Sequence, residues 1–256
     1  MKYGDSICIF KNEHTIHLYE LVQILKNNKI KVNFYLIYEP IVPLEIINLF
    51  LPVSIKLFIT NNIYEHPHIH CMPIGIRDCE KVVPNHKYFS HDIMYNEGLK
   101  HVEKNILCLM CFSYTHIERN RCYDLLKDKE FVSNLNDLNF EKQPSIHCGK
   151  VPVWINYEYT HKSLYVLSPR GAGEDCHRFY EAIYLNSIPI VKRTNTSFDK
   201  LYNTFPCLII NDWNEVTREF LEKKKDECIK KLINFKLKYE NAFTDINSIQ
   251  ELLLKM

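Results

Sequence analysis

The fold of this chain is indicated most clearly by residues 168–182, which read S-P-R-G-A-G-E-D-C-H-R-F-Y-E-A. The apolar run Ser163–Leu167 comes just before and is typical of a buried strand in a parallel sheet. A glycine turn then leads into a predicted helix over 176–186, and the apolar run Ile188–Val191 follows. The sequence therefore predicts a β-turn-α-β unit, in which two parallel strands are joined through a helix.

The turn of this unit has the composition of a phosphate-binding site. Gly171 and Gly173 are two of only six glycines in the chain, and glycine lets a backbone approach a ligand closely or adopt a positive φ. Asp175 is expected to cap the helix, whose N-terminal N–H groups and dipole favour an anion. Arg170 and Arg178 can add charge-assisted hydrogen bonds. A glycine pair without such companions more often marks an ordinary turn.

Glu181 follows Arg178 by three residues, so the two side chains lie on the same helical face about one turn apart. A carboxylate at this place can accept hydrogen bonds from the hydroxyls of a ribose. Tyr157 and Tyr159, which precede the motif, are candidates for stacking on a nucleobase or a sugar ring, although core packing is the favoured interpretation. The motif as a whole therefore predicts a site for a phosphorylated ligand.

Residues 168–191 resemble the donor-sugar motif of the exostosin-like glycosyltransferases, which reads approximately S-P-R-G-x-G-x-D-x-H-R-x-x-E-A, then a small residue and I-P-I-V. Cys176 departs from it where Ser or Thr is common. Asn186 departs where Gly commonly ends the helix, but Asn tolerates the left-handed conformation. The resemblance covers about residues 100–215.

This resemblance implies an α/β fold of the GT-B type, with two Rossmann-like domains whose parallel sheets face a cleft. It also implies inverting sugar transfer, and a ribose contact for the counterpart of Glu181. The donor-binding residues implied by the motif are Ser168, Arg170, Gly171, Gly173, Asp175, His177, Arg178 and Glu181.

A second cluster of polar residues follows the predicted strand Ile106–Phe112. Thr115 is expected to cap the next helix, and Arg119 or Arg121 can reach the carboxyl ends of the strands, where open α/β sheets bind ligands. Related glycosyltransferases often carry S-x-T and an arginine here. The likeness implies donor contacts for Ser113 and Thr115 and a pyrophosphate contact for Arg119. A solvent-facing arginine is an equally good interpretation.

Strands and helices alternate along the chain, which is typical of α/β proteins. Strands are predicted at 6–10, 31–38, 55–60, 69–74, 106–112, 163–167, 188–191 and 207–210, and helices at 15–27, 43–50, 116–127, 153–161, 176–186, 215–235 and 246–254. The polar stretch 78–103 is predicted to connect an acceptor domain, residues 1–100, to a nucleotide-sugar-binding domain, residues 101–256.

Composition argues against several classes of protein. The 256 residues are 46% hydrophobic and 25% charged, which is enough for one large core or two small ones. A net charge of +1 argues against a nucleic-acid-binding or membrane-surface protein. Prolines and charges interrupt the most apolar region, Ile41–Ile59, so no membrane span is predicted. Met1–Asp5 lacks the layout of a signal peptide, and a cytoplasmic location is therefore expected.

Neither cysteine nor histidine predicts a metal site or a disulfide framework. The ten cysteines lie scattered in apolar runs and are interpreted as free thiols. Cys108 and Cys111 have C-x-x-C spacing, but a strand would point them to opposite faces. His66, His68 and His70 would share one face of an extended segment, yet the sequence holds no partner pair at structural-zinc spacing.

The predicted reaction moves a sugar from a nucleotide-diphosphate sugar, expected to be a UDP-sugar, to a glycan hydroxyl. No D-x-D motif occurs, so arginines and the helix dipole are expected to neutralise the leaving diphosphate in place of a metal ion or other cofactor. Asp78 is the first candidate for the base, followed by Glu13 and His66, because all three come after predicted strands. Two alternatives are a non-catalytic nucleotide-sugar or glycan-binding module and a nucleotide-sugar hydrolase.

Overall fold

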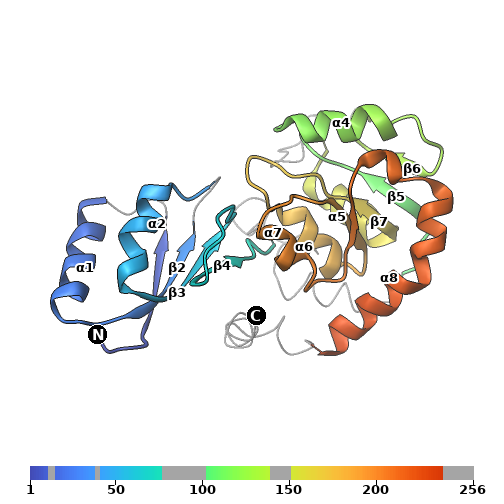
Figure 1. Ribbon diagram of the computed structural model, residues 1–256. Helices are drawn as coiled ribbons and strands as arrows, with labels where there is room; N and C mark the ends of the chain where they lie inside the picture. The colour runs from blue at the N-terminus through green and yellow to red at the C-terminus, as the bar shows by residue number, and fades with distance from the viewer. Residues whose placement is uncertain (11–14, 38–40, 77–101, 139–150, 239–256) are drawn as a thin grey trace. The chain divides into compact units, whose positions relative to one another are not determined.

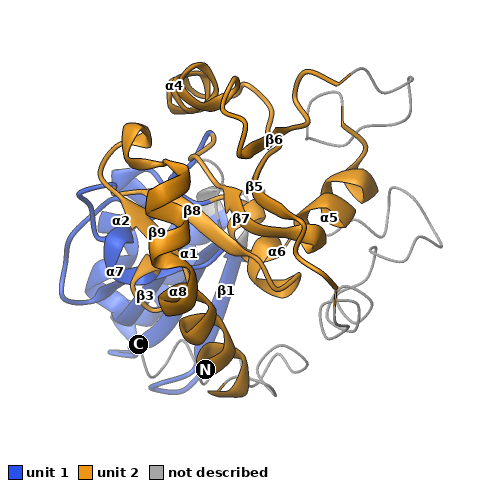
Figure 2. Cartoon of the chain, turned by 90° about the vertical axis from the view of Figure 1, so that its right-hand side faces the viewer, with its two compact units in different colours: residues 1–74, 172–175, 194–201 blue, residues 75–171, 176–193, 202–256 orange. Residues whose placement is uncertain are grey.

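The computed structural model describes residues 1–10, 15–37, 41–76, 102–138 and 151–238 (Figure 1). They form two compact units (Figure 2). The first comprises residues 1–74, 172–175 and 194–201, and the second comprises residues 75–171, 176–193 and 202–256. Each unit contains a sheet of parallel strands with helices between them, so the prediction of an α/β fold with two parallel sheets is confirmed.

The first sheet has its strands in chain order: β1 (Ser6–Phe10), β2 (Val32–Ile37), β3 (Ser54–Thr60) and β4 (Ile69–Met72). The connections carry α1 (Thr15–Asn27), α2 (Leu44–Phe50) and the 3-10 turn η1 (Leu51–Val53). The chain steps across this sheet in one direction, and right-handed crossovers then place α1 and α2 on the same face. Val22 of α1 and Phe50 of α2 accordingly share one apolar core with Phe34 and Leu57.

The second sheet has the order β6-β5-β7-β8-β9, and all of its strands are parallel. Its strands are β5 (Ile106–Met110), β6 (Val132–Asn134), β7 (Ser163–Leu167), β8 (Ile188–Lys192) and β9 (Leu208–Ile210). The helical elements of this part of the chain are α4 (Ile117–Leu126), α5 (Val153–Lys162), α6 (His177–Tyr184), α7 (Phe198–Tyr202), η2 (Trp213–Glu215) and α8 (Arg218–Lys238).

The central strands of this sheet are covered on both faces, which explains their continuous apolar sequence. All five residues of β7 are buried. Val166 of β7 packs with Leu109 of β5 and Ala182 of α6 in one core cluster. Tyr165 donates its hydroxyl to the carbonyl of Leu221 on α8 at 2.9 Å. Layers of helix on both sides therefore leave the ends of the strands as the place where a ligand can meet the sheet.

The strand order reverses beside β5. The chain leaves β5 for β6 at the edge of the sheet, and then returns to β7 on the other side of β5. Open parallel sheets bind ligands at such a topological switch point, outside the carboxyl ends of the strands. The switch point is flanked by the loop after β5 and the turn after β7, which carry the two polar clusters singled out in the sequence.

Several details differ from the sequence prediction. The three-residue strand β6 and the short helix α7 were not predicted, and α8 begins at Arg218 after the 3-10 turn η2. The predicted helix 246–254 and the domain boundary after residue 100 lie outside the described residues, so both stay predictions. Within the described residues, every helix is too short or too polar to cross a membrane.

Candidate functional site

A buried arginine joins the two loops at the switch point. Arg119 lies on the first turn of α4 and is 7% exposed. Its Nε donates to the carbonyl of Arg170 at 3.0 Å, and its Nη1 donates to the carbonyl and the hydroxyl of Ser113 at 3.0 and 3.1 Å. Two of the three guanidinium nitrogens thus bind the protein itself and fix the spacing of the loops that follow β5 and β7.

The two glycines of the turn make room for protein side chains. A Cβ at Gly171 would lie 2.7 Å from Nη2 of Arg119, and a Cβ at Gly173 would collide with the side-chain amide of Asn61. Positive φ among the described glycines occurs at Gly4 and Gly75. The expectation of a positive φ in the turn is therefore wrong, and close approach is the reason for both glycines.

Asp175 does not cap α6 as the sequence predicted. Cys176 holds the N-cap position and makes no side-chain capping bond. Asp175 precedes the cap, where its N–H donates to Oδ1 of Asn61 at 2.8 Å and its Oδ2 accepts the N–H of Ile74 at 3.0 Å. The expected capping role is therefore corrected: the cap position belongs to Cys176, and Asp175 binds Asn61 and Ile74 of the first unit.

The cap of α4 is also displaced by one residue. His116 holds the N-cap position, and its Nδ1 accepts the N–H of Glu118 at 3.2 Å, whereas the predicted cap, Thr115, is exposed. Partial burial, with Arg170 as a second cause, lowers the pKa of His116. A neutral imidazole is the form that can accept this hydrogen bond.

The carboxylate of Glu181, on α6, is buried. It is 2% exposed, and its Oε1 accepts the hydroxyl of Tyr157 at 2.7 Å. Within the described residues Glu181 forms no ion pair, and its Oε2 receives no hydrogen bond. Removing a carboxylate from water without a cationic partner costs several kcal/mol. Because a carboxylate oxygen can accept a hydrogen bond from a ligand, Glu181 is a candidate for ligand binding.

Arg178 lies one turn before Glu181 and is also buried, at 5% exposure. Its guanidinium carbon lies 5.7 Å from the ring centroid of Phe112, at the end of β5, which is a cation–π geometry. Arg178 therefore reaches the end of β5, and it shares α6 with Glu181, as the sequence predicted.

The remaining residues of the motif are held by the backbone. The hydroxyl of Ser168 donates to the carbonyl of Val166 at 3.4 Å. Nδ1 of His177 lies 2.9 Å from the carbonyl oxygen of Gly75. Asn186 has a φ of 59°, so the prediction that asparagine supplies the left-handed conformation after α6 is confirmed.

The sequence offered three candidates for a base. Asp78 and Glu13 lie outside the described residues, and His66 is an exposed residue of the loop before β4. His70 packs against Phe58, and its pKa is lowered mainly by burial. In the part of the chain that the structure describes, no three His, Cys, Asp or Glu side chains form a group suited to a metal ion.

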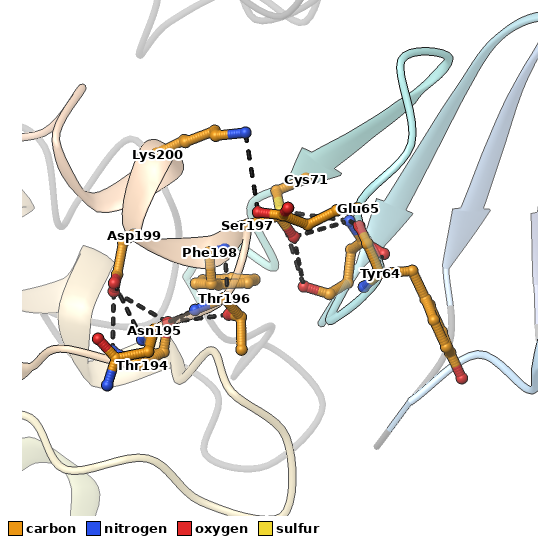
Figure 3. A network of polar contacts seen from close by, with 11 residues as sticks. Tyr64, Glu65, Cys71, Thr194, Asn195, Thr196, Ser197, Phe198, Asp199 and Lys200 are labelled. Atoms are coloured by element: carbon orange, nitrogen blue, oxygen red, sulfur yellow. Dashed lines mark hydrogen bonds and ion pairs between the residues drawn. The ribbon is translucent and has the colours of Figure 1, made fainter.

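Asn61 and Asn62, which sequence reasoning treated only as the end of a strand, hold two later segments within the first unit. Asn61 binds Asp175, as described above, and Nδ2 of Asn62 donates to the hydroxyl of Ser197 at 3.1 Å. Figure 3 shows Ser197 beside Cys71, at 3.6 Å between Oγ and Sγ. The sequence signal that could have indicated this role is the pair of asparagines directly after an apolar strand.

No family model matches the chain, and no curated protein matches it. A structure of trehalose-6-phosphate from E. coli bound with UDP-2-fluoro glucose has a TM-score of 0.49 and 13% identity, covering 100% of this chain and 73% of that one. A trehalose-6-phosphate synthase has a TM-score of 0.48, 12% identity and coverages of 100% and 72%. An α1,3-fucosyltransferase has a TM-score of 0.36, 10% identity and coverages of 98% and 82%. All three TM-scores are below 0.5, so we base a function on the chain's own residues.

Proposed function

We propose that this chain is a glycosyltransferase that transfers a sugar from a nucleotide-diphosphate sugar to a glycan hydroxyl. The observation that carries the proposal is the buried carboxylate of Glu181 on the helix that follows β7, which forms no ion pair within the described residues. The proposed donor is a UDP-sugar, and the sugar is a hexose or a pentose. Transfer with inversion and without a metal ion completes the proposal.

The proposed roles follow from the positions of the side chains. Glu181 accepts a hydroxyl of the donor ribose, because an ionised carboxylate is an acceptor and its Oε2 receives no other hydrogen bond from the described residues. Arg170 binds the diphosphate from the turn after β7. Arg119 positions Arg170 by holding its carbonyl group.

In the proposed reaction, a base removes the proton of the acceptor hydroxyl as its oxygen attacks the anomeric carbon. The bond from that carbon to the diphosphate oxygen breaks, and negative charge grows on the diphosphate. Arg170 and Arg178 stabilise this charge as preorganised cationic donors. Asp78 remains the proposed base.

Nucleotide titration of the purified protein tests the donor site. UDP, GDP and UDP-sugars are added to the wild type and to Glu181→Gln and Arg170→Ala, with melting temperature and calorimetry as the readouts. We expect UDP to raise the melting temperature of the wild type by mass action. Both variants should lose this response, whereas Glu158→Gln, a partly exposed carboxylate paired with Lys162, should keep it.

Glu181→Gln carries a second expectation. The amide keeps an acceptor for Tyr157 but has no charge to desolvate, so the ligand-free variant should melt at or above the wild-type temperature. A variant that is more stable yet unresponsive to UDP would identify Glu181 as a functional group. If the wild type binds no nucleotide, with or without divalent cations, the donor-site proposal is wrong.

A transfer assay then separates the proposed enzyme from its alternatives. The wild type is incubated with a UDP-sugar that it binds, with and without oligosaccharide acceptors. Product that depends on the acceptor supports a glycosyltransferase. Free sugar released at the same rate without acceptor would indicate a hydrolase, and tight binding without turnover would indicate a binding module.

A further inference from the structure

We propose that Tyr157 is a positioning residue for Glu181, which it orients so that a single carboxylate oxygen, Oε2, receives a hydroxyl of the donor ribose. This inference rests on the nucleotide site proposed above. It concerns a contact between two helices of the second unit, α5 and α6.

Tyr157 is suited to hold another group in place because it is fully buried. Its side chain is 0% exposed, on α5 of the second unit. A buried side chain sits in one rotamer among close-packed neighbours, so the direction of its hydroxyl is fixed by the core. Tyr157 therefore does not present a ring face for stacking on a ligand, which was one interpretation of the sequence.

A glutamate carboxylate without a partner has little preference about its last torsion angle, since that torsion is broad. The 2.7 Å hydrogen bond from the Tyr157 hydroxyl favours one orientation of the Glu181 carboxylate, so its two oxygens are no longer equivalent. Oε1 accepts the hydrogen bond from Tyr157, and Oε2 receives no hydrogen bond from the described residues. A hydrogen bond to an ionised acceptor is also stronger than one between neutral groups.

The chemistry of the donor supports the same inference. An arginine at this place could bind both carboxylate oxygens at once and would pair their charge. A phenol is neutral and donates one hydrogen bond, so the carboxylate keeps both its charge and one open oxygen. The ligand that fits must donate a hydroxyl hydrogen bond. A ribose has two ring hydroxyls that can do so, and a deoxyribose has lost one of them.

The test compares ribose and deoxyribose ligands by calorimetry on the full chain. UDP, 2′-deoxy-UDP and 3′-deoxy-UDP are titrated into the wild type, Tyr157→Phe and Tyr165→Phe. We expect the wild type to bind one deoxy ligand about tenfold more weakly than UDP, as for a lost hydrogen bond to a charged group. In Tyr157→Phe this penalty should fall to about threefold or less.

Tyr165→Phe is the matched control, because it also deletes a hydroxyl hydrogen bond from a fully buried tyrosine. It should also weaken folding, but it should keep the tenfold difference between UDP and the deoxy ligand. A purely structural role for Tyr157 would weaken UDP and its deoxy analogues equally and leave their ratio unchanged. An unchanged ratio in Tyr157→Phe therefore overturns the inference while the nucleotide site stands.

The other outcomes are equally decisive. No binding of UDP by the wild type removes the proposed function and this inference together. If the wild type binds UDP and both deoxy analogues with equal affinity, a nucleotide site is supported, but the ribose contact on which Tyr157 is proposed to act is wrong. If Tyr157→Phe does not fold, 3-fluorotyrosine placed at position 157 gives a second readout. Its ¹⁹F resonance should move more with UDP than with the penalised deoxy analogue, and equal shifts would overturn the inference.

Discussion

The side-chain amide of Asn61 occupies the space that a Cβ at Gly173 would need, and this close approach can be tested by a double-mutant cycle. Gly173→Ala places a methyl group on the Asn61 amide and should destabilise the protein by about 2 kcal/mol. Asn61→Ala removes the obstacle but also the acceptor for the N–H of Asp175, which should cost about 1–3 kcal/mol. Because the clash needs both side chains, the double variant should be less destabilised than the sum, by about 1 kcal/mol or more. Urea denaturation measures all three variants.

Gly75→Ala is the control for this cycle. Its added methyl group would meet no atom within 4 Å, and the residue has a φ of 70°, so its cost comes from backbone strain alone. That cost should be the same in the wild-type background and in the Asn61→Ala background. Strict additivity of Gly173→Ala and Asn61→Ala would show that the turn relaxes away from the amide.

The positions of the motif residues could be predicted from the sequence, but their partners could not. Spacing correctly placed Arg178 and Glu181 near each other on one helix. Asn61 precedes Gly173 by more than a hundred residues, and no local pattern pairs the two. The hydrogen bond from Tyr157 to Glu181 likewise depends on how two helices pack. Local sequence determines a side chain's place on its element, whereas its contacts depend on tertiary packing.

At the scale of elements, apolar runs were sufficient to predict most strands and helices. Strand β6 was missed because it is three residues long and its sequence, V-S-N, carries little apolar signal. The caps of α4 and α6 were each placed one residue from their true positions. Thr115 and His116 can both cap, and the choice between them depends on where the chain leaves β5, so local propensity could not settle it.

Lys104 connects the ends of several elements of the second unit, and it predicts a pH dependence of folding. Its Nζ donates to the carbonyl of His161 at 2.6 Å, and to the carbonyl of Leu185 and the hydroxyl of Ser187, both at 3.2 Å. Burial lowers the pKa of Lys104 to about 7, from 10.5, and repulsion from Lys236 contributes. Between these values the unfolded chain binds more protons than the folded one, so stability rises with pH across this window.

Lys104→Met removes this contribution. The free energy of unfolding, measured in urea at pH 7 and pH 9.5, should rise less with pH in the variant than in the wild type. Lys236, whose pKa burial lowers to about 8, retains its own part of the dependence. The exposed residue Lys223 provides a control variant, Lys223→Met, that should match the wild type. Equal pH dependence in Lys104→Met and the wild type would contradict the prediction.

At the scale of the whole molecule, the first unit is not a continuous piece of chain. Residues 172–175 and 194–201 belong to it, although each lies between elements of the second sheet. Asp199 organises the later segment by accepting the N–H of Thr194 at 2.8 Å and its hydroxyl at 2.9 Å (Figure 3). Neither segment has the apolar periodicity that marks a domain in sequence, which is why the predicted division was a single cut.

This arrangement predicts that a fragment of residues 1–76 is markedly less stable than the same residues in the intact chain. The fragment loses the buried side chains of Phe198 and Leu201 and three hydrogen bonds, which join Asn61 to Asp175, Ile74 to Asp175 and Asn62 to Ser197. At about 1 kcal/mol for each bond, roughly 3 kcal/mol is lost, from a total that is typically about 5–15 kcal/mol.

Amide hydrogen exchange of β3 measures the difference, because Leu57–Thr60 are buried in the intact chain. The slowest amides of β3 should exchange at least a hundredfold faster in the fragment, which corresponds to about 3 kcal/mol. Ser197→Ala in the full chain deletes one of the three bonds and should give an intermediate acceleration. Equal protection in the fragment and the intact chain would show that residues 1–76 fold without the two later segments.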